Sequence, residues 1–369
     1  MNKKTKIALG MSGGVDSSLC AHLLVEQGYQ VTGVFLECWR APGCRTDEDR
    51  ADALKIALAL GIPFQVLDFK TAYYDKVVAE FFAQYKAGIT PNPDIACNKE
   101  IKFGLFYDWA LANGFDAVAT GHYAAIRNKQ LVIPKDTNKD QTYFLHQLAS
   151  EQLEHMIFPL ADLTKPEVRL EAKKRDLAVC DKKDSVGICF IGDINVHAFL
   201  KEELGENPGE VIDTQGNVIG SHQGLWFYTI GQRHGFTVDK KSLHTSANGE
   251  VLEKENLPPF YVVAKQPEGN KLVVGFGKET YSNSFIVKEP HWIDPSQTAL
   301  QTPSGKLFVR IRHTGKLLAC SVSEIANGIQ VSLAEPVQGI APGQSAVFYQ
   351  QTTTDTICLG GGVISPFDA

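Results

Sequence analysis

The sequence predicts a doubly wound parallel α/β sheet, followed by a helical segment and two small all-β barrel domains. Up to about residue 150, short apolar strands alternate with amphipathic helices, the pattern of a parallel sheet with helices on both faces. Residues 140–204 carry leucine and aromatic side chains at three- and four-residue spacing, which indicates helices. From about residue 208, turns rich in Asp, Asn and Gly separate short β-branched and aromatic runs, which predicts all-β structure.

The expected elements follow this division. The strands of the sheet are expected at Lys6–Met11, Val31–Trp39, Phe64–Phe69 and Ala117–Tyr123, and helices at Ser17–Gln27, Glu48–Leu60, Tyr74–Ala87, Ile101–Asn113, Asp140–Leu148, Lys165–Asp176 and Asn195–Leu204. We expect an α/β domain over residues 1–205, with a helical region at about 140–204, and then β domains over 208–277 and 284–369.

Length, charge and cysteine content exclude several classes of protein. The chain has 369 residues and a formal net charge of −6, which argues against a generic polyanion binder, because sequence-independent nucleic-acid affinity needs many Lys and Arg contacts. Apolar runs stay below the roughly 18 residues of a membrane span, and no export signal is visible, so we expect a cytoplasmic protein without a membrane partner. Because the eight cysteines include no Cys-x-x-Cys pair, we expect no metal site and no bound iron–sulfur cluster.

A glycine-rich loop follows the first expected strand. Residues 10–18 read Gly-Met-Ser-Gly-Gly-Val-Asp-Ser-Ser, directly before a helix. Gly13 and Gly14 lack a Cβ atom, so their N–H groups can approach an anion at which the helix directs its positive end. The loop lacks the Gly-Lys-Ser/Thr ending of a Walker loop, and its hydroxyls and the Asp16 carboxylate suit a pyrophosphate group with magnesium. The alternative is a tight turn that only caps the helix.

Two further loops leave the same edge of the expected sheet. Ligands of such sheets bind beyond the carboxyl ends of the strands. The glycine loop, the segment after Val31–Trp39 and Thr120-Gly121-His122 all follow strand ends. We therefore expect these three loops to meet at one nucleotide site.

The segment Thr90–Asn98 holds a candidate catalytic pair. Pro91 and Pro93 are expected to stiffen a surface loop and to exclude it from sheet or helix. Asp94 and Cys97 lie three residues apart, so the carboxylate can approach the thiol or a bound substrate. The alternative is that Asp94 caps a helix that begins near Asn98, while Cys97 fills a gap beneath it.

A second candidate thiol, Cys189, lies in an apolar run between two glycines. Such a run is more often a core strand, but nearby cations lower the pKa of a thiol and favour the reactive thiolate. The adjacent basic residues are Lys173, Lys174, Arg175, Lys182 and Lys183. Cys20 and Cys320 lie in apolar periodic runs and are expected in the core.

Two polar segments are candidates for RNA contacts. Lys139-Asp140-Gln141 is expected to open a helix, either as a cap or as a group that binds a base or a phosphate. Arg310 and Arg312 alternate around Ile311, so both guanidinium groups are expected on one exposed strand face. Such a face favours contact with phosphate or base slightly over scattered solubility charges.

Taken in order, these segments resemble the tRNA-specific 2-thiouridylases (the MnmA/TrmU family), which carry an ATP pyrophosphatase loop. The resemblance runs through residues 8–18, 90–104, 117–124, 139–145, 165–192, 223–233 and 336–362. It implies a Rossmann-like sheet of the ATP pyrophosphatase type, a tRNA-anchoring helical region, and β domains that hold the anticodon arm. Ala125 and the segment His234–Val238 depart from the family pattern, the first at a possible RNA contact and the second in the central domain.

The resemblance also implies a role for each matching residue. The expected ATP-binding residues are Gly10, Met11, Ser12, Gly13, Gly14, Val15, Asp16, Ser17, Leu36 and Gly121. Asn92, Pro93 and Asp94 are expected to face the target base, with Asp94 as acid/base group, Cys97 as nucleophile and Cys189 as the persulfide carrier. The expected tRNA contacts are His122, Lys139, Asp140, Gln141, Arg310, Ile311 and Gln344.

The implied reaction replaces oxygen by sulfur at C2 of the wobble uridine. ATP with Mg²⁺ would adenylate that oxygen, and persulfide sulfur would displace AMP. The sulfur would come from a cysteine-desulfurase-derived donor or relay protein, and a Cys97–Cys189 disulfide would close on its release. The rival readings are an amide-forming ATP pyrophosphatase and a nucleotide-sensing RNA-binding module without turnover.

Overall fold

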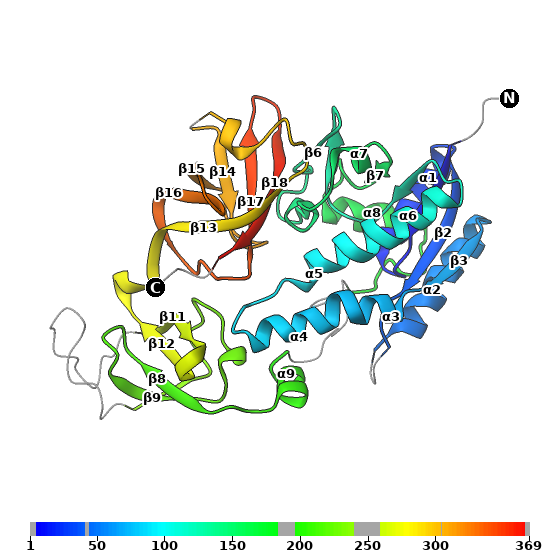
Figure 1. Ribbon diagram of the computed structural model, residues 1–369. Helices are drawn as coiled ribbons and strands as arrows, with labels where there is room; N and C mark the ends of the chain where they lie inside the picture. Colours follow the sequence, from blue (N-terminus) through cyan, green and yellow to red (C-terminus); the bar gives the residue numbers. More distant parts are fainter. Residues whose placement is uncertain (1–4, 41–43, 184–195, 240–258, 304, 366–369) are drawn as a thin grey trace.

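A five-stranded parallel sheet organises the N-terminal part of the computed structural model, which describes residues 5–40, 44–183, 196–239, 259–303 and 305–365 (Figure 1). Its strand order is β3-β2-β1-β4-β7, and all pairings are parallel. The strands are β1 (Lys6–Gly10), β2 (Gln30–Glu37), β3 (Phe64–Asp68), β4 (Ala117–Ala119) and β7 (Met156–Ile157). The expected parallel sheet is confirmed, and the short strand β7 is an addition from a segment expected to be helical.

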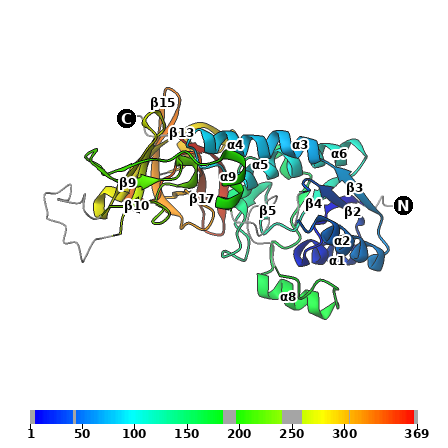
Figure 2. The same cartoon turned by 90° about the horizontal axis from the view of Figure 1, so that it is seen from below.

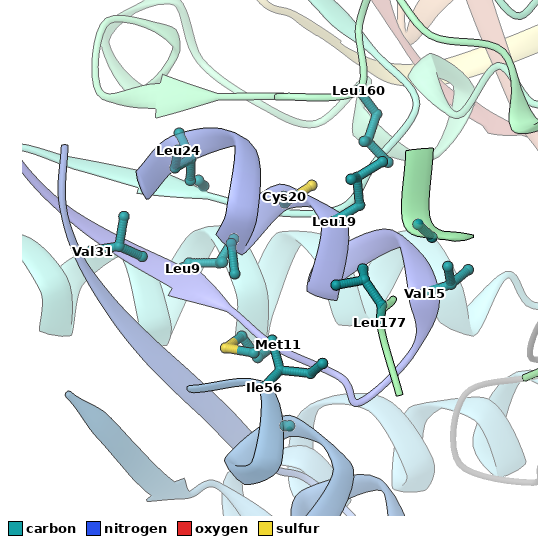
Figure 3. Close-up of a cluster of buried hydrophobic side chains, with 14 of the residues drawn as sticks. Leu9, Met11, Val15, Leu19, Cys20, Leu24, Val31, Ile56, Leu160 and Leu177 are labelled. Carbon is teal, nitrogen blue, oxygen red and sulfur yellow. The ribbon is translucent and has the colours of Figure 1, made fainter. Parts of the chain in front are cut away.

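Helices cover both faces of this sheet, as a doubly wound fold requires. Helices α1 (Val15–Glu26), α2 (Thr46–Leu60) and α8 (Lys165–Lys174) contribute to one core, while the helical run that ends in α6 (Phe106–Ala112) contributes to the other. Along β1, Leu9 faces the first core and Ala8 the second, because successive strand side chains point to opposite faces. Figure 3 shows Leu9 and Met11 packed with Leu19 of α1 in the first core.

Two long helical runs lie side by side across the middle of the molecule (Figure 1 and Figure 2). The first comprises α3 (Lys70–Tyr73), η1 (Tyr74–Val78) and α4 (Ala79–Lys86), and the second comprises α5 (Pro93–Ala96), η2 (Cys97–Leu105) and α6. The second run begins at Pro93, so the expected loop over Thr90–Asn98 is wrong beyond Asn92. Proline lacks only an N–H group that is unpaired in a first helical turn anyway, and it therefore starts this helix.

The segment 140–204 is less helical than expected. A short 3₁₀ turn, η3 (Thr142–Leu145), replaces the expected helix Asp140–Leu148. The cause is local: the Asp140 carboxylate accepts hydrogen bonds from the backbone N and the Oγ1 of Thr142, at 2.9 and 2.7 Å, which favours a turn over a helix. The remaining helices of the segment are α7 (Ser150–Leu153), α8 and α9 (Val196–Leu204). No helix within the described ranges is both long and apolar enough to cross a membrane.

All-β structure follows α9, as the sequence predicts. A five-stranded sheet of order β10-β9-β8-β12-β11 comes first. Its strands are β8 (Gly209–Ile212), β9 (Val218–His222), β10 (Thr237–Val238), β11 (Tyr261–Gln266) and β12 (Lys271–Gly275). Its apolar side packs against the first long helical run, where Phe81 and Tyr85 share a core with Val211 and Leu272.

A closed six-stranded barrel forms the C-terminal part. Its strands are β13 (Tyr281–Trp292), β14 (Leu307–Arg310), β15 (Leu318–Ile325), β16 (Gly328–Gln338), β17 (Ser345–Gln351) and β18 (Thr356–Ile364), and pairing of β13 with β18 closes it. A hairpin from the α/β part, β5 (Ala125–Arg127) and β6 (Gln130–Val132), extends this sheet through Val132 and Ile357. Strands of three residues carry little sequence pattern, so this hairpin was missed.

Candidate active site at the sheet edge and the barrel junction

The glycine loop connects the end of β1 to the start of α1, as the sequence predicts. Gly13 has φ +71°, a conformation that side chains rarely adopt, and a Cβ added there would lie 2.1 Å from the Asp49 carbonyl oxygen. Hydrogen bonds within the loop fix its conformation. The Ser12 backbone N donates to Ser17 Oγ at 3.1 Å, and Ser18 Oγ donates to the Gly14 carbonyl at 2.8 Å. These bonds fix the loop directly above the positive end of α1, where an anion would be stabilised.

A second loop from the same edge of the sheet meets the glycine loop. It follows β4, and a Cβ added to Gly121 would lie 3.0 Å from the Ser17 backbone N and 3.3 Å from Asp16. Leu36 lies at the same edge near the end of β2, half-buried and packed into the second core of the sheet. The expected meeting of the strand-end loops is therefore confirmed for the loops that hold Gly13 and Gly121.

Asp16 is held by two groups that sequence reasoning missed. The Lys165 ammonium donates to both Asp16 carboxylate oxygens, at 2.8 and 2.9 Å, and the Tyr123 hydroxyl donates to Oδ1 at 2.9 Å. Lys165 opens α8, whose start is fixed by Glu167 accepting from the N and Oγ1 of Thr164 at 2.7 and 2.9 Å. The helix start is visible in the sequence as Thr-x-x-Glu, but nothing local indicates that Lys165 faces the glycine loop. The motif of the glycine loop contains no lysine of its own. Lys165, about 150 residues further along the chain, places one beside the loop.

A second lysine, Lys182, is also turned toward the loop. Its ammonium donates to the Gly13 carbonyl at 2.9 Å and to Asp49 and Asp52 at 2.7 and 2.8 Å. Burial lowers the pKa of Lys182, but the hydrogen bonds to the two carboxylates outweigh burial and raise it. This cation therefore stays charged beside the loop, where it ties Gly13 to α2.

The expected basic cluster around Lys182 is largely neutralised by carboxylates. Arg175 pairs with Glu26 at 2.9 Å and also with Glu171, and Lys174 pairs with Glu171 at 2.7 Å. Lys173 lies 3.3 Å from Asp181. The cations of this cluster named here are therefore paired with carboxylates, while Lys173 and Lys174 remain exposed. Cys189 itself lies outside the described residues.

Both β parts, the central one that holds β8–β12 and the C-terminal barrel, form hydrogen bonds with the start of the second helical run. Asn92 caps the helix, with its Oδ1 accepting from the Ile95 N at 3.4 Å, so Asn92 and not Asp94 is the cap. Gln344 of the barrel donates to the carbonyls of Thr90 and Pro91, at 3.0 and 3.2 Å. On the other side, Thr90 Oγ1 donates at 3.2 Å to Oγ1 of Thr229, which lies between β9 and β10 of the central β part. Pro93 is buried and Asp94 half-buried at this junction.

The thiol of Cys97 is buried in the first turns of this helix, with 4% of the residue exposed. Burial raises its pKa to about 12, and the charges of Cys38 and Asp94 act in the same direction. The positive charge of Lys102 and the Tyr73 hydroxyl favour the thiolate but do not outweigh burial. In this structure the thiol is therefore protonated near neutral pH. Cys20 and Cys320 are buried, as expected.

The expected exposed arginine face is wrong. Arg310 is buried at the end of β14, where it pairs with the buried Asp140 at 2.7 Å and lies 5.1 Å from the centre of the Tyr349 ring. Ile311 is buried in the barrel, and only Arg312, beyond the strand, is exposed. The alternation rule fails here because the strand ends at Arg310, so the next residues no longer alternate between two faces.

The remaining predicted RNA contacts differ in exposure. His122 is buried, its Nδ1 lies 2.7 Å from Thr120 Oγ1, and burial followed by the charge of Lys102 lowers its pKa well below the usual value. Gln141 Oε1 accepts from the Tyr123 N at 2.8 Å. Lys139 is exposed. Of this set, therefore, Lys139 presents a charge to solvent while the others are fixed inside the protein.

A magnesium ion would find oxygen donors at the glycine loop, and the chemistry of those donors fits it. Asp16 and the hydroxyls of Ser12 and Ser17 lie together there, although both Asp16 oxygens already accept from Lys165. Within the described part of the chain, no group of three or more His, Cys, Asp or Glu residues is arranged to hold a metal by itself. Any ion at the loop would therefore need ligands from the bound nucleotide.

Three family models match consecutive parts of the chain. They are described as a tRNA methyl transferase HUP domain over residues 5–193, a tRNA methyl transferase PRC-barrel domain over 197–276 and an aminomethyltransferase beta-barrel domain over 282–364. A solved structure, the U34-tRNA thiolase NcsA from Methanococcus maripaludis, is 22% identical with a TM-score of 0.36 and covers 55% of this chain and 63% of its own.

Curated relatives match almost the whole length. The tRNA-specific 2-thiouridylase MnmA of Pseudomonas fluorescens Pf-5 is 41% identical and covers 98% of this chain and 94% of its own. The protein of the same name from Stutzerimonas stutzeri is 42% identical, with coverages of 98% and 95%. At this identity and coverage, and with a HUP-domain model matched over half of the chain, the chain belongs to the family of tRNA-specific 2-thiouridylase enzymes.

Proposed function

We propose that this protein is a tRNA-uridine 2-sulfurtransferase that adenylates C2 of the wobble uridine with ATP and then replaces the adenylated oxygen by sulfur. The observation that carries the proposal is the pairing of two sites. The glycine loop, with Lys165 and Lys182 beside it, suits the phosphates of ATP. In the same α/β part, the helix start that holds Asp94 and Cys97 is hydrogen-bonded to both β parts.

ATP is assigned to the edge of the sheet. Gly10 to Ser17 would bind the phosphates through backbone N–H groups, while Gly121 would line the nucleotide and Leu36 would contact adenine through its backbone. Magnesium, held by Asp16 and the phosphates, would supply positive charge that offsets the charge of the pyrophosphate. Lys165 would then turn from Asp16 to a phosphate oxygen, because both are anionic partners within its reach.

The target uridine is assigned to the clamped helix start. Its base must leave the anticodon stack to reach this position. Asn92, Pro93 and Asp94 would face the base, and Asp94 would act as the acid/base group. The oxygen at C2 attacks the α-phosphorus of ATP, pyrophosphate leaves, and the base carries AMP on that oxygen.

Sulfur transfer is assigned to Cys97 and Cys189. A donor protein derived from a cysteine desulfurase would load Cys189 as a persulfide. The terminal sulfur attacks C2 and expels AMP, and the Cys97 thiolate then attacks Cys189 Sγ, breaking the sulfur–sulfur bond. The sulfur stays on C2, the two cysteines form a disulfide, and a thiol reductant must reopen it. Because burial holds Cys97 protonated, Lys102 and Tyr73 are the groups that would favour its deprotonation.

The anticodon arm is assigned to the α/β part and the barrel. Lys139 is exposed and can meet a phosphate directly. The other expected contact residues would act by shaping the surface, since each is buried or half-buried. They are His122, Asp140, Gln141, Arg310, Ile311 and Gln344.

Pyrophosphate release and nucleoside analysis test this function together. With ATP, Mg²⁺, a sulfur source and tRNA carrying a wobble uridine, we expect pyrophosphate and 2-thiouridine in equal amounts. Without tRNA, we expect almost no pyrophosphate. Tight tRNA binding without pyrophosphate would favour the non-enzymatic RNA-binding reading, and release that needs only a small amine and a carboxylate would favour the amide-forming reading.

Mass spectrometry of two variants distinguishes the proposed roles of the two thiols. A Cys189→Ser protein should form no persulfide on that residue and no thiouridine, whereas Cys97→Ser should accumulate a Cys189 persulfide that is not discharged. A persulfide found only on Cys97 would reverse the two roles.

A further inference from the structure

Four buried polar atoms at the barrel junction have no hydrogen-bond partner among the described residues. They are Asp94 Oδ1, Asn98 Oδ1, Arg310 Nε and His313 Nδ1, and we call these four residues the junction cluster. A buried polar atom left without a partner destabilises the folded state, so native proteins rarely keep several in one place. Such a group is expected where a ligand supplies the missing partners.

The cluster is assembled from two sides that meet at Phe144. Asp94 and Asn98 lie four residues apart on one helical run, hence on one face of it. Asn98 Nδ2 donates to the Phe144 carbonyl at 3.4 Å, which leaves Oδ1 as its open atom. From the barrel side, the His313 ring lies on the Phe144 ring, with centroids 4.2 Å apart and planes inclined by 33°.

Charge interactions with His313 indicate that the same residues lie close together. The charges of Asp140, Arg310, Asp94 and Lys139 all act on His313, in that order of strength after burial. Burial dominates and lowers the pKa of His313, so its ring is neutral near pH 7 and carries one N–H donor and one acceptor. Arg310 keeps its Nε open because its pairing with Asp140 uses Nη1.

The open atoms are a mixture of acceptors and donors. Asp94 and Asn98 offer oxygen acceptors, Arg310 offers an N–H donor, and His313 offers either. A phosphate would need donors only, and a carboxylate beside it would repel it. The imide edge of uracil carries an N–H group between two carbonyl oxygens, so it can satisfy both kinds of atom at once.

We propose that Asn98 and His313 read the imide edge of the target uracil, an inference that rests on the proposed function. Asn98 Oδ1 accepts from N3–H, and His313 donates to the carbonyl oxygen at C4, which leaves the oxygen at C2 open to ATP. Cytosine presents an acceptor at N3 and an amino group at C4, so both contacts would be reversed. These two residues would therefore select uracil over cytosine as well as orient it.

The test combines two protein variants with two substrates. tRNA with uridine at the wobble position is compared with tRNA that carries 3-methyluridine there and so lacks the N3–H donor. For the parent protein, kcat/KM for pyrophosphate release should fall about tenfold or more on the methylated substrate. Asn98→Ala should lose about tenfold on uridine and should no longer distinguish the two substrates.

His313 is tested by its own pair of variants. His313→Ala should lower kcat/KM about tenfold on both substrates, while tRNA affinity stays within about twofold because backbone contacts supply it. His313→Gln, whose amide can still donate, should keep most of the activity. His155→Ala, at an exposed histidine, is the matched control and should behave as the parent.

The outcomes distinguish the inference from the function on which it rests. If the parent makes no thiouridine, the proposed function fails. If the parent is active and Asn98→Ala still distinguishes the two substrates, or His313→Ala matches the parent, the assignment of these residues is wrong. If the Asn98→Ala protein unfolds at a clearly lower temperature than the parent, Asn98→Asp is tested in its place, because it keeps the oxygen acceptor. The Asn98→Asp protein should still prefer uridine over 3-methyluridine, and loss of that preference would also overturn the proposal.

Discussion

The glycine loop and the barrel junction of this protein are built in different ways. At the glycine loop, the hydrogen bonds that fix the loop itself join residues close in sequence, as among Ser12, Ser17 and Gly14, and the distant Lys165 and Lys182 are added to them. At the barrel junction, the defining contacts join distant residues: Arg310 and Asp140 are 170 positions apart, and Gln344 and Thr90 are 254 apart. A local motif can reveal the first kind of site, whereas the second exists only once the chain has folded.

The regions also differ in how their charges are satisfied. At the glycine loop, Asp16 is already paired with Lys165, and Lys182 with Asp49 and Asp52. At the junction, Asp94 and His313 keep buried atoms open. Under the proposed function, the loop would exchange one ionic partner for a phosphate, while the junction would gain hydrogen bonds that it lacks. The first site depends on charge, and the second on shape and hydrogen-bond pattern.

The largest expected effect is at the glycine loop. Asp16→Ala should lower tRNA-dependent pyrophosphate release by about 10²-fold or more, because the charge that holds the phosphate end of the site together is lost. Asp162→Asn, at an exposed carboxylate paired with Arg127, is the matched control and should keep the parent rate. Parent-like release by the Asp16 variant would show that the nucleotide binds elsewhere.

At the junction, the expected effect is on stability. Arg310→Ala should lower the free energy of unfolding by about 3–5 kcal/mol, because the buried Asp140 carboxylate loses its counter-ion. Arg312→Ala, at the exposed neighbour, should change it by at most about 0.5 kcal/mol. Urea unfolding of the two variants measures this difference. Equal stabilities would mean that Arg310 and Asp140 do not form a buried pair in solution.

Burial of Cys97 predicts slow chemistry in the ligand-free protein. A pKa raised to about 12 means that the thiolate, the form that reacts, becomes abundant only well above pH 8. At pH 8, iodoacetamide should therefore modify Cys97 at least about tenfold more slowly than the exposed Cys44, and the Cys97 rate should keep rising with pH. Mass spectrometry of time points gives both rates. Equal rates at pH 8 would mean that the thiol is exposed.

The smallest expected effect concerns RNA affinity at the barrel surface. Arg312 is exposed, so Arg312→Ala should weaken tRNA binding and lower the slope of log affinity against log salt by about one. ATP affinity should stay at the parent value, because the glycine loop belongs to the α/β part and Arg312 to the barrel. A salt slope identical to that of the parent would remove Arg312 from the RNA-binding surface.

The same contrast explains what the sequence could predict. The parallel sheet, the glycine loop and the all-β C-terminal half were predictable because strand periodicity and glycine placement are local. The helix start at Pro93 was misread as a loop, although proline also fits a first helical turn. The buried state of Arg310 and the approach of Lys165 to Asp16 were not predictable, because both depend on partners more than 100 residues away.

The central claim is that the glycine loop activates a base held at the barrel junction, and transfer of the α-phosphate of ATP tests it most directly. The Cys189→Ser protein is mixed with tRNA and ATP labelled at the α-phosphate, then denatured rapidly. We expect label on the tRNA at the wobble uridine, about one per active protein. We expect no label when the same chain also carries the Asp16→Ala substitution. Pyrophosphate released without tRNA, with no label on RNA, would contradict it.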